Sequence, residues 1–221
     1  MRHHRHSTHS PFGFSTYTGT IIAINVAFFI VYLIFAGIYG ELKSVELFAL
    51  KPSNILAGKA LWTFLTSMFL HANLTHLFVN MISLMFIGNF VEKLIGKKRF
   101  LWFYLISGFF ASLFFIALAF FTGNDLNVYA VGASGAIFGL GGLLAILTPR
   151  LPVLVFFVFP MPMWAAMIFL LLALWAMSLG LGIPIGNTAH LGGLLVGIVY
   201  GSILKTKYPR RTRMISQYFS R

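Results

Sequence analysis

The chain has 221 residues, of which 59% are hydrophobic and only 9% are charged, and its formal net charge is +12 at pH 7. So few charged residues cannot cover the surface of a water-soluble domain of this length, so the composition favours a protein that crosses a membrane several times. The positive charge does not indicate nucleic-acid binding, because lysine and arginine cluster at the ends of apolar runs, where membrane orientation requires them. The absence of cysteine excludes disulfides, thiolate metal sites and a cysteine nucleophile.

The N-terminal residues, MRHHRHSTHS, are polar and rich in histidine. They could bind a metal ion, but a flexible tail is the simpler interpretation. The first apolar run is too long for the core of a signal peptide, so we expect an anchor that stays in the membrane. We divide the chain into a flexible cytoplasmic tail over 1–18, a membrane domain over 19–205 and a basic cytoplasmic tail over 206–221.

Apolar runs near twenty residues, the length that crosses the hydrocarbon core, predict six membrane-spanning helices. In chain order the predicted spans are 19–38, 73–91, 100–122, 132–147, 161–179 and 188–204. The first half of the chain shows no clear repeat of the second, which argues for one domain without the internal duplication of many transporters. The sequence therefore predicts an all-α polytopic membrane protein with a bundle of six transmembrane helices.

Two connections between the predicted spans are unusual. The first loop, 39–72, is too polar to cross a membrane and too apolar to be a free linker. Because it contains Trp62 and several Phe and Leu residues, we expect it to lie partly in the headgroup region. The segment 149–160 is apolar but rich in proline and β-branched residues. We expect an irregular interfacial segment there, with Pro160 and Pro162 in or near the first turn of the fifth span.

The distribution of lysine and arginine predicts the orientation of the spans. Thirteen of the 16 basic residues lie in the N-terminal tail, the loops after spans two and four, and the C-terminal tail, and the other three lie in the first loop. The positive-inside rule then places both termini in the cytoplasm and the N-terminal ends of spans two, four and six at the outer face. The compact form of the chain suits a prokaryotic plasma membrane better than an organelle.

Polar residues gather at this outer level. His71 and His76 lie at the start of span two, Ser134 at the start of span four and His190 at the start of span six. Each has a structural interpretation by itself, since a serine among small residues can be a helix contact, and a histidine or Asn80 can bond across helices. These structural interpretations do not explain why all of these residues would lie at the same depth in the membrane. Because ionisable residues inside spans are costly, their convergence indicates a functional site.

Glycine spacing predicts how spans four and six meet. Three glycines follow His190 on one helical face, and span four carries a pair of its own: Gly193, Gly197, Gly201, Gly135 and Gly139. Such a seam lets two helix backbones approach closely. This approach would bring His190 within hydrogen-bond reach of Ser134, as a general base requires.

Span two supplies candidate donors for an oxyanion. His76 and Asn80 are four residues apart and share a helical face. The Asn80 amide is a neutral donor, less costly to bury than a charge, and suits a carbonyl oxygen that becomes negative. The start of span four adds free backbone N–H groups, including that of Ser134.

Elimination narrows the chemistry further. The only aspartate, Asp125, lies in a loop, which excludes a protease with two catalytic aspartates. No HExxH motif occurs, so a zinc protease is unsupported. No acidic residue is placed to orient His190, so a serine hydrolase would use a Ser–His dyad. We expect no cofactor and no metal.

Four motifs, in order and in the expected spans, resemble the rhomboid family of intramembrane serine proteases. They are HANLTHLFVNM (71–81), GNFVEKLIG (88–96), GASGA (132–136) and AHLGGLLVG (189–197). The resemblance covers the chain from about Glu46 to Tyr200. It implies a six-helix core around a water-filled cavity open to the outer face, with span five and the first loop regulating substrate access. Its implied substrates are membrane-spanning proteins, cut in or near a helix that can unwind; the natural substrate and the oligomeric state stay open.

The resemblance also implies roles for individual residues. Ser134 would be the nucleophile and His190 its general base, and His76, Asn80 and the Ser134 amide would form the oxyanion hole. Supporting roles fall to a second set of residues: His71, Glu92, Phe138, Gly132, Gly193 and Gly197.

This sequence departs from the family pattern at two positions. Thr63 follows Trp62 where the family often has arginine, so the contribution of that arginine is in doubt. Phe138 stands where many members have a tyrosine that packs under the catalytic histidine. Phenylalanine keeps the stacking surface and loses the hydroxyl, and neither departure removes a reacting group.

Two other functions compete with a protease. A non-catalytic relative could use the same fold to bind client helices or to thin the bilayer around them, but such a protein should have lost some of the dyad and oxyanion residues, and all are present. A small transporter or channel predicts charged or broken helices in the middle of the spans, and the sequence shows neither.

Overall fold

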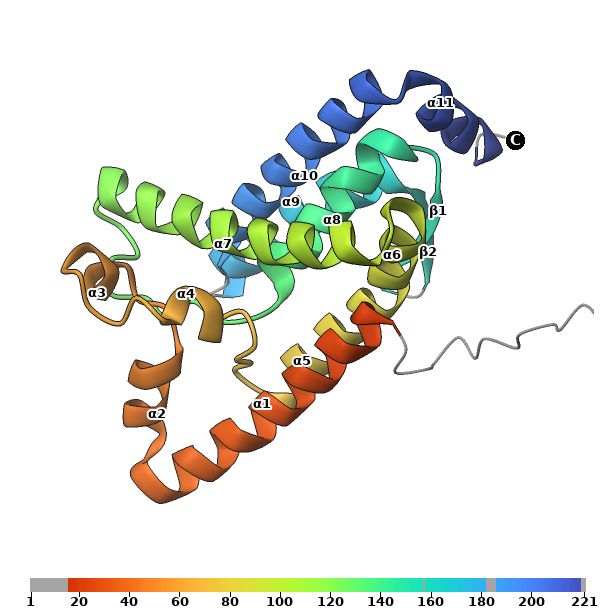
Figure 1. Ribbon diagram of the computed structural model, residues 1–221. Coiled ribbons are helices and arrows are strands. Elements are labelled where there is room, and N and C mark those ends of the chain that lie inside the picture. The colour runs from red at the N-terminus through yellow and green to blue at the C-terminus, as the bar shows by residue number, and fades with distance from the viewer. Residues whose placement is uncertain (1–15, 157, 182–185, 220–221) are drawn as a thin grey trace, which may run out of the picture.

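The computed structural model describes residues 16–156, 158–181 and 186–219 (Figure 1). Its helices are α1 (Tyr17–Tyr39), α2 (Glu41–Phe48), α3 (Pro52–Leu56), α4 (Thr63–Thr66), α5 (Leu74–Ser83), the π-helix η1 (Leu84–Gly88), α6 (Asn89–Ile95), α7 (Lys97–Thr122), α8 (Ser134–Leu147), α9 (Met163–Leu181), α10 (Asn187–Lys207) and α11 (Pro209–Tyr218). The strands β1 (Pro152–Val155) and β2 (Phe159–Pro162) form a small antiparallel sheet. Most of the predicted tail over 1–18 lies outside the described residues.

The predicted all-α polytopic membrane bundle is confirmed, and helical segments of the structure correspond to all six predicted spans. Five segments are long and apolar enough to cross a membrane: α1, the continuous α5–η1–α6, α7, α9 and α10. The sixth, α8, has only 14 residues. At 1.5 Å per residue it is about 21 Å long, against a hydrocarbon core of about 30 Å. A helix this short cannot reach both membrane surfaces, so at least one of its ends lies below a surface.

The centre of the bundle is α8, which packs closely against α10 and α7, while α9 lies along another side (Figure 1). Its leucines Leu140, Leu143 and Leu144 have no exposed surface. A helix that is apolar on every side belongs in the interior rather than at a surface. The start of α8 is therefore held in place by neighbours on several sides.

The N-terminal helix α1 begins at Tyr17, so its first two residues lie within the predicted tail over 1–18. Glu92 of α6 explains this start. Its carboxylate accepts hydrogen bonds from the Thr18 N–H at 2.8 Å, the Thr18 hydroxyl at 2.7 Å and the Tyr17 N–H at 3.0 Å. These bonds satisfy free donors at the helix start and place a negative charge at its positive end.

The first loop folds into α2, α3 and α4 rather than a free linker. Leu50 is fully buried and forms a β-bridge with Ala130, which joins this loop to the loop before α8. Other apolar side chains of the loop are exposed, among them Leu61 and Leu65. The loop therefore packs on the bundle and also presents an apolar surface. Its position in the headgroup region stays a prediction.

The prediction of an irregular segment over 149–160 was wrong, because β1 and β2 form an antiparallel hairpin there. Prolines occupy the outermost pair, Pro152 with Pro162, and Pro160 lies inside β2 rather than in the helix. In a two-stranded sheet every strand is an edge strand, so the missing N–H groups of the prolines are tolerated. Pro162 directly precedes α9, as its predicted place near the first turn requires.

Candidate active site

The candidate site begins at Ser134, the first residue of α8, which is half-buried. A backbone hydrogen bond of 3.0 Å from the Ile137 N–H to the Ala133 carbonyl joins the first turn of the helix. The N–H of Ser134 therefore precedes the helical ladder and stays available as a donor. The position of Ser134 thus combines a hydroxyl with a free backbone N–H and the positive end of a helix.

His190, in the first turn of α10, contacts Ser134 directly. The distance from His190 Nε2 to Ser134 Oγ is 2.8 Å, and only 6% of the His190 surface is exposed. The imidazole stacks on the ring of Phe138, with 4.6 Å between ring centroids and 15° between planes. Phe138 lies one helical turn after Ser134, so α8 supplies both the hydroxyl and the surface that orients the imidazole.

The other imidazole nitrogen of His190 has no hydrogen-bond partner in the described part of the chain. Nδ1 of His190 is buried and accepts or donates no hydrogen bond within the described ranges. The ring orientation therefore rests on the Ser134 contact and the Phe138 stack, without a carboxylate behind it.

The glycine seam explains the close approach of α8 and α10. A methyl group built on Gly193 would collide with the Gly135 carbonyl oxygen, and one on Gly197 would collide with the Gly139 carbonyl oxygen. Gly193 is three residues after His190, on the same side of α10. The contact of the two helices is therefore backbone against backbone, and it lies directly beside the dyad.

The same two glycines of α8, Gly135 and Gly139, also lie close to α7. A Cβ on Gly135 would lie 2.8 Å from the Ala111 Cβ, and one on Gly139 would lie 2.5 Å from Ser107 Oγ. The position of Ser134 is therefore determined from two sides.

His76 and Asn80 of α5 lie against Gly132, two residues before the start of α8. Gly132 has φ of +118°, a conformation that favours glycine, and its N–H donates to the Ser67 carbonyl at 2.8 Å. A Cβ at Gly132 would lie 2.8 Å from His76 Cε1 and 3.5 Å from Asn80 Nδ2. A side chain at position 132 would thus collide with the His76 ring, whereas Asn80 would remain in ordinary van der Waals contact with it.

Asn80 is 5% exposed, and its Nδ2 is a buried donor with no acceptor among the residues that the structure describes. Buried donors in proteins nearly always have a partner, so this unpaired donor is suited to an oxygen that arrives with a bound molecule. This geometry brings Asn80 together with the Gly132–Ser134 segment, as the sequence indicated for an oxyanion site.

His71 lies behind His76. Its ring is fully buried, its Nδ1 is 3.2 Å from the Phe69 carbonyl oxygen, and its centroid is 5.1 Å from that of His76. Burial, with a smaller contribution from the charge of His76, lowers the pKa of His71 to about 4. His71 is therefore neutral at neutral pH and supports the His76 ring by contact.

Three other residues singled out in the sequence lie outside this cluster. Glu92 bonds the start of α1, as described above. Thr63 is buried within the first loop, and its hydroxyl donates to the Ala60 carbonyl at 2.7 Å. Trp62 donates from Nε1 to the Leu47 carbonyl at 2.8 Å, so both residues serve the fold of the loop.

Sequence reasoning missed Asn73. Its side chain caps α5 by accepting a 2.8 Å hydrogen bond from the His76 N–H, which determines where the helix carrying His76 and Asn80 begins. An asparagine immediately before an apolar periodic run is a recognised N-cap signal and could have been used. No comparable local sequence pattern predicts the hydrogen bond between Gly132 and Ser67.

Comparisons with known proteins find similar sequences over most of the chain. The family model described as the Rhomboid domain matches residues 58–207. RHOMBOID-like protein 6, mitochondrial, from Arabidopsis thaliana is 35% identical over 160 residues, which is 72% of this chain and 48% of that protein. Rhomboid protease AarA from Providencia stuartii is 30% identical over 213 residues, 89% of this chain and 75% of that protein.

Rhomboid protein 1, mitochondrial, from Saccharomyces cerevisiae (strain ATCC 204508 / S288c) is 33% identical over 138 residues, 61% of this chain and 39% of that protein. The chain thus spans half or less of the length of the plant and yeast relatives described here.

Proposed function

This chain belongs to the rhomboid family and is an integral membrane protein, and from this premise we propose that it is an intramembrane serine endopeptidase. Its substrates would be membrane proteins, cut in or near their transmembrane segments. Ser134 and His190 would form the catalytic dyad, and His76, Asn80 and the Ser134 N–H the oxyanion hole. The contact of 2.8 Å between Ser134 Oγ and His190 Nε2 supports this proposal most strongly.

The reaction follows from these positions. His190 Nε2 takes the hydroxyl proton as Ser134 Oγ bonds to the carbonyl carbon, and the oxyanion accepts hydrogen bonds from Asn80, His76 and the Ser134 N–H. The tetrahedral intermediate then breaks its C–N bond, and His190 returns the proton to the leaving amine. Water, activated in turn by His190, hydrolyses the acyl-enzyme and regenerates the Ser134 hydroxyl.

The missing carboxylate places a specific demand on the site. His190 becomes a cation during the reaction, and Phe138 presents a ring face to it at 4.6 Å. The negative face of an aromatic ring stabilises a nearby cation. We propose that this stack provides the orientation, and part of the stabilisation, that an acid provides in a triad.

Substrate choice follows from the bilayer. A transmembrane helix has all its backbone groups bonded internally, and exposing one carbonyl to Ser134 breaks hydrogen bonds that lipid cannot replace. Segments with glycine, proline or other helix-breaking residues lower this cost. We therefore expect cleavage beside such residues rather than in uniformly helical segments, and water must reach the site for hydrolysis.

We propose further that both termini lie in the cytoplasm and that the site opens to the outer face, because the basic residues concentrate on one side of the spans. For the compartment we propose a prokaryotic plasma membrane. A mitochondrial membrane is the alternative, since two of the relatives are named as mitochondrial proteins.

The proposed function is tested by incubating the purified protein in liposomes with a panel of single-span proteins, followed by sequencing of the new termini. We expect cleavage in or near the spans that contain helix-breaking residues. Ser134→Ala is the matched control and should leave the same substrates intact. Cleavage by Ser134→Ala would contradict the assignment of Ser134 as the nucleophile. No cleavage of any substrate, together with no labelling of any serine by a fluorophosphonate, would favour the non-catalytic scaffold.

Asn80→Ala is expected to lower kcat by about 100-fold to 1,000-fold, with little change in KM. The amide would bond the substrate oxygen mainly when it carries negative charge, so its loss acts on the transition state. Single-substrate kinetics on a purified model substrate measure this. Asn89→Ala is the control, because Asn89 lies in the same span but donates to the Met85 carbonyl at 2.6 Å. Equal effects of the two substitutions would contradict a role of Asn80 in the reaction.

A further inference from the structure

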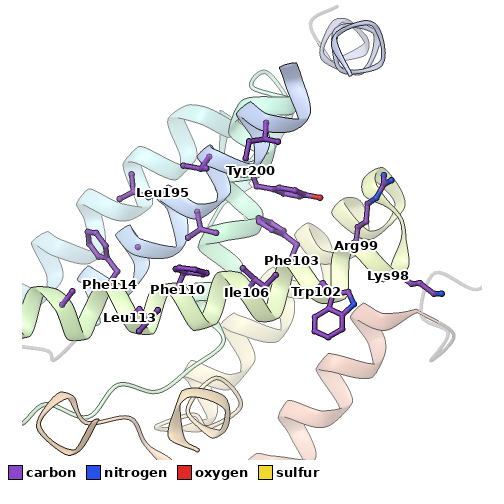
Figure 2. Close-up of a pocket in the computed structure, with 15 residues that line it drawn as sticks. Lys98, Arg99, Trp102, Phe103, Ile106, Phe110, Leu113, Phe114, Leu195 and Tyr200 are labelled. Carbon is purple, nitrogen blue, oxygen red and sulfur yellow. The ribbon is translucent and has the colours of Figure 1, made fainter. Parts of the chain in front are cut away.

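An open groove of about 950 Å³ runs between α7 and α10 (Figure 2). At one end the two helices touch, because a Cβ on Gly192 would lie 2.5 Å from the Phe114 Cβ. From this contact α10 diverges from α7 toward Tyr200. The groove therefore closes near Gly192 and widens toward the end where α7 begins.

The walls of the groove are apolar and face outward. Ile106 and Phe110 line it from α7, and Leu195 and Val199 line it from α10, with 41–58% of each side chain exposed. At the wide end Phe103 stacks on Tyr200, with 4.7 Å between ring centroids and 26° between planes. In a membrane protein such a surface lies against lipid chains.

The wide end of the groove is positively charged. Lys98 and Arg99, in the first turn of α7, line it and are exposed. Of the four acidic residues of the chain, Glu92 accepts three hydrogen bonds from the start of α1. The other three lie in the first loop and in the loop after α7. No acidic side chain of the chain is thus placed to neutralise this end.

Aromatic residues complete the pattern of a lipid headgroup site. Trp102 lines the groove one turn after Lys98 and is 65% exposed. Figure 2 shows the Tyr200 hydroxyl directed toward the same end of the groove as Arg99. Tryptophan and tyrosine are enriched where hydrocarbon meets headgroups, so the membrane surface lies near these residues.

The groove runs along α7 from Lys98 to Ala117, and its part between Arg99 and Phe110 matches the depth of one leaflet. Arg99 and Phe110 are separated by 11 residues of α7, which corresponds to about 16 Å of helix. The hydrocarbon core is about 30 Å thick, so this distance is close to the depth that one acyl chain covers.

From these observations we infer that the groove binds one anionic phospholipid of the leaflet at which α7 begins. Its phosphate contacts Lys98 and Arg99, and one acyl chain lies between α7 and α10 along Ile106 and Val199. Basic pockets between membrane helices recognise anionic headgroups, and the guanidinium group of arginine is matched to phosphate oxygens. This inference does not depend on the proposed protease activity.

The inference is tested by native mass spectrometry of the detergent-solubilised protein, titrated with phosphatidylglycerol or with phosphatidylcholine of the same chains. We expect one phosphatidylglycerol to be retained at saturation, with a Kd about 30-fold below that of phosphatidylcholine, as two basic side chains provide. The double variant Lys98→Gln/Arg99→Gln should lose this preference. Its matched control is Arg210→Gln/Arg211→Gln, which removes the same charge from exposed positions of α11 outside the groove and should bind as wild type.

Two further experiments separate the contribution of the acyl chain to binding from that of the headgroup. Val199→Trp fills the apolar part of the groove at an exposed position and should weaken phosphatidylglycerol binding while Lys98 and Arg99 remain. Excess glycerol phosphate should fail to displace the lipid, because it lacks the acyl chain. Three results would each overturn the proposed site. They are undiminished lipid binding by the Lys98/Arg99 or Val199 variant, an equal loss of binding in the Arg210/Arg211 control, and displacement of the lipid by glycerol phosphate.

Discussion

His190→Ala is expected to abolish labelling of Ser134 by a fluorophosphonate and to lower kcat/KM for a transmembrane substrate by at least about 10,000-fold. Without the imidazole at 2.8 Å, the Ser134 hydroxyl keeps its proton and remains a weak nucleophile at neutral pH. The protein should still fold, because α8 and α10 meet through backbone contacts of the glycine seam, which the substitution leaves intact. Labelling is measured by mass spectrometry of the intact protein and of its peptides.

Ser134→Ala should have an equal effect on cleavage, and the double variant should be no worse than either single one, because the two residues act as a unit. Ser202→Ala is the matched control, an exposed serine of α10 outside the site. Labelling that persists in His190→Ala would contradict its role as general base, whereas labelling that moves to another serine would contradict the assignment of Ser134.

Gly193→Ala is expected to lower kcat by about 100-fold or more, although it adds only one methyl group. That methyl group would collide with the Gly135 carbonyl oxygen, and backbone atoms cannot rotate away as a side chain can. Hence α8 and α10 must separate, which moves His190 away from Ser134. Displacements of about 1 Å in a catalytic site cost this much in rate, and overpacking costs about 1–3 kcal/mol in stability.

The seam prediction is checked by three measurements on Gly193→Ala: cleavage kinetics, the rate of fluorophosphonate labelling and the midpoint of thermal unfolding in detergent. All three should fall. Gly37→Ala is the control, since a Cβ at Gly37 in α1 meets no atom within 4 Å and alanine favours a helix. If Gly193→Ala behaves like Gly37→Ala, the close approach of the two backbones does not determine the geometry of the dyad.

Within the site, local sequence patterns were informative where chemistry and helix geometry act over a few residues. Gly193 and Gly197 could be assigned to the face of His190 from their spacing alone, and Asn80 to the face of His76. By contrast, the contact of Gly132 with His76 and Asn80 joins two segments more than fifty residues apart in the chain. No local pattern encodes such a contact, because it depends on the packing of α5 against the start of α8.

Segments outside the spans also formed structure that their local sequence did not predict. The hairpin β1–β2 has an unfavourable composition for strands, since three of its eight residues are prolines. The pairing of the two strands satisfies backbone N–H and C=O groups of the segment between the apolar helices α8 and α9. These groups require partners within the protein only once it has folded. Helix α11 likewise lies in a stretch where charge alone predicted a basic tail, and its Thr212 is buried.

The six spans and their order were determined by the sequence itself, because the thickness of the hydrocarbon core imposes a length and a composition that any single span displays. The shared depth of Ser134 and His190 followed from the same constraint, since each residue opens a span that starts from the same side. What only the tertiary structure decided is the lateral arrangement: which helices touch, the 2.8 Å contact, and the divergence of α7 from α10 that opens the groove. Lipid is apolar on every side of a span, so hydropathy cannot say which face meets a neighbour, and close packing decides it.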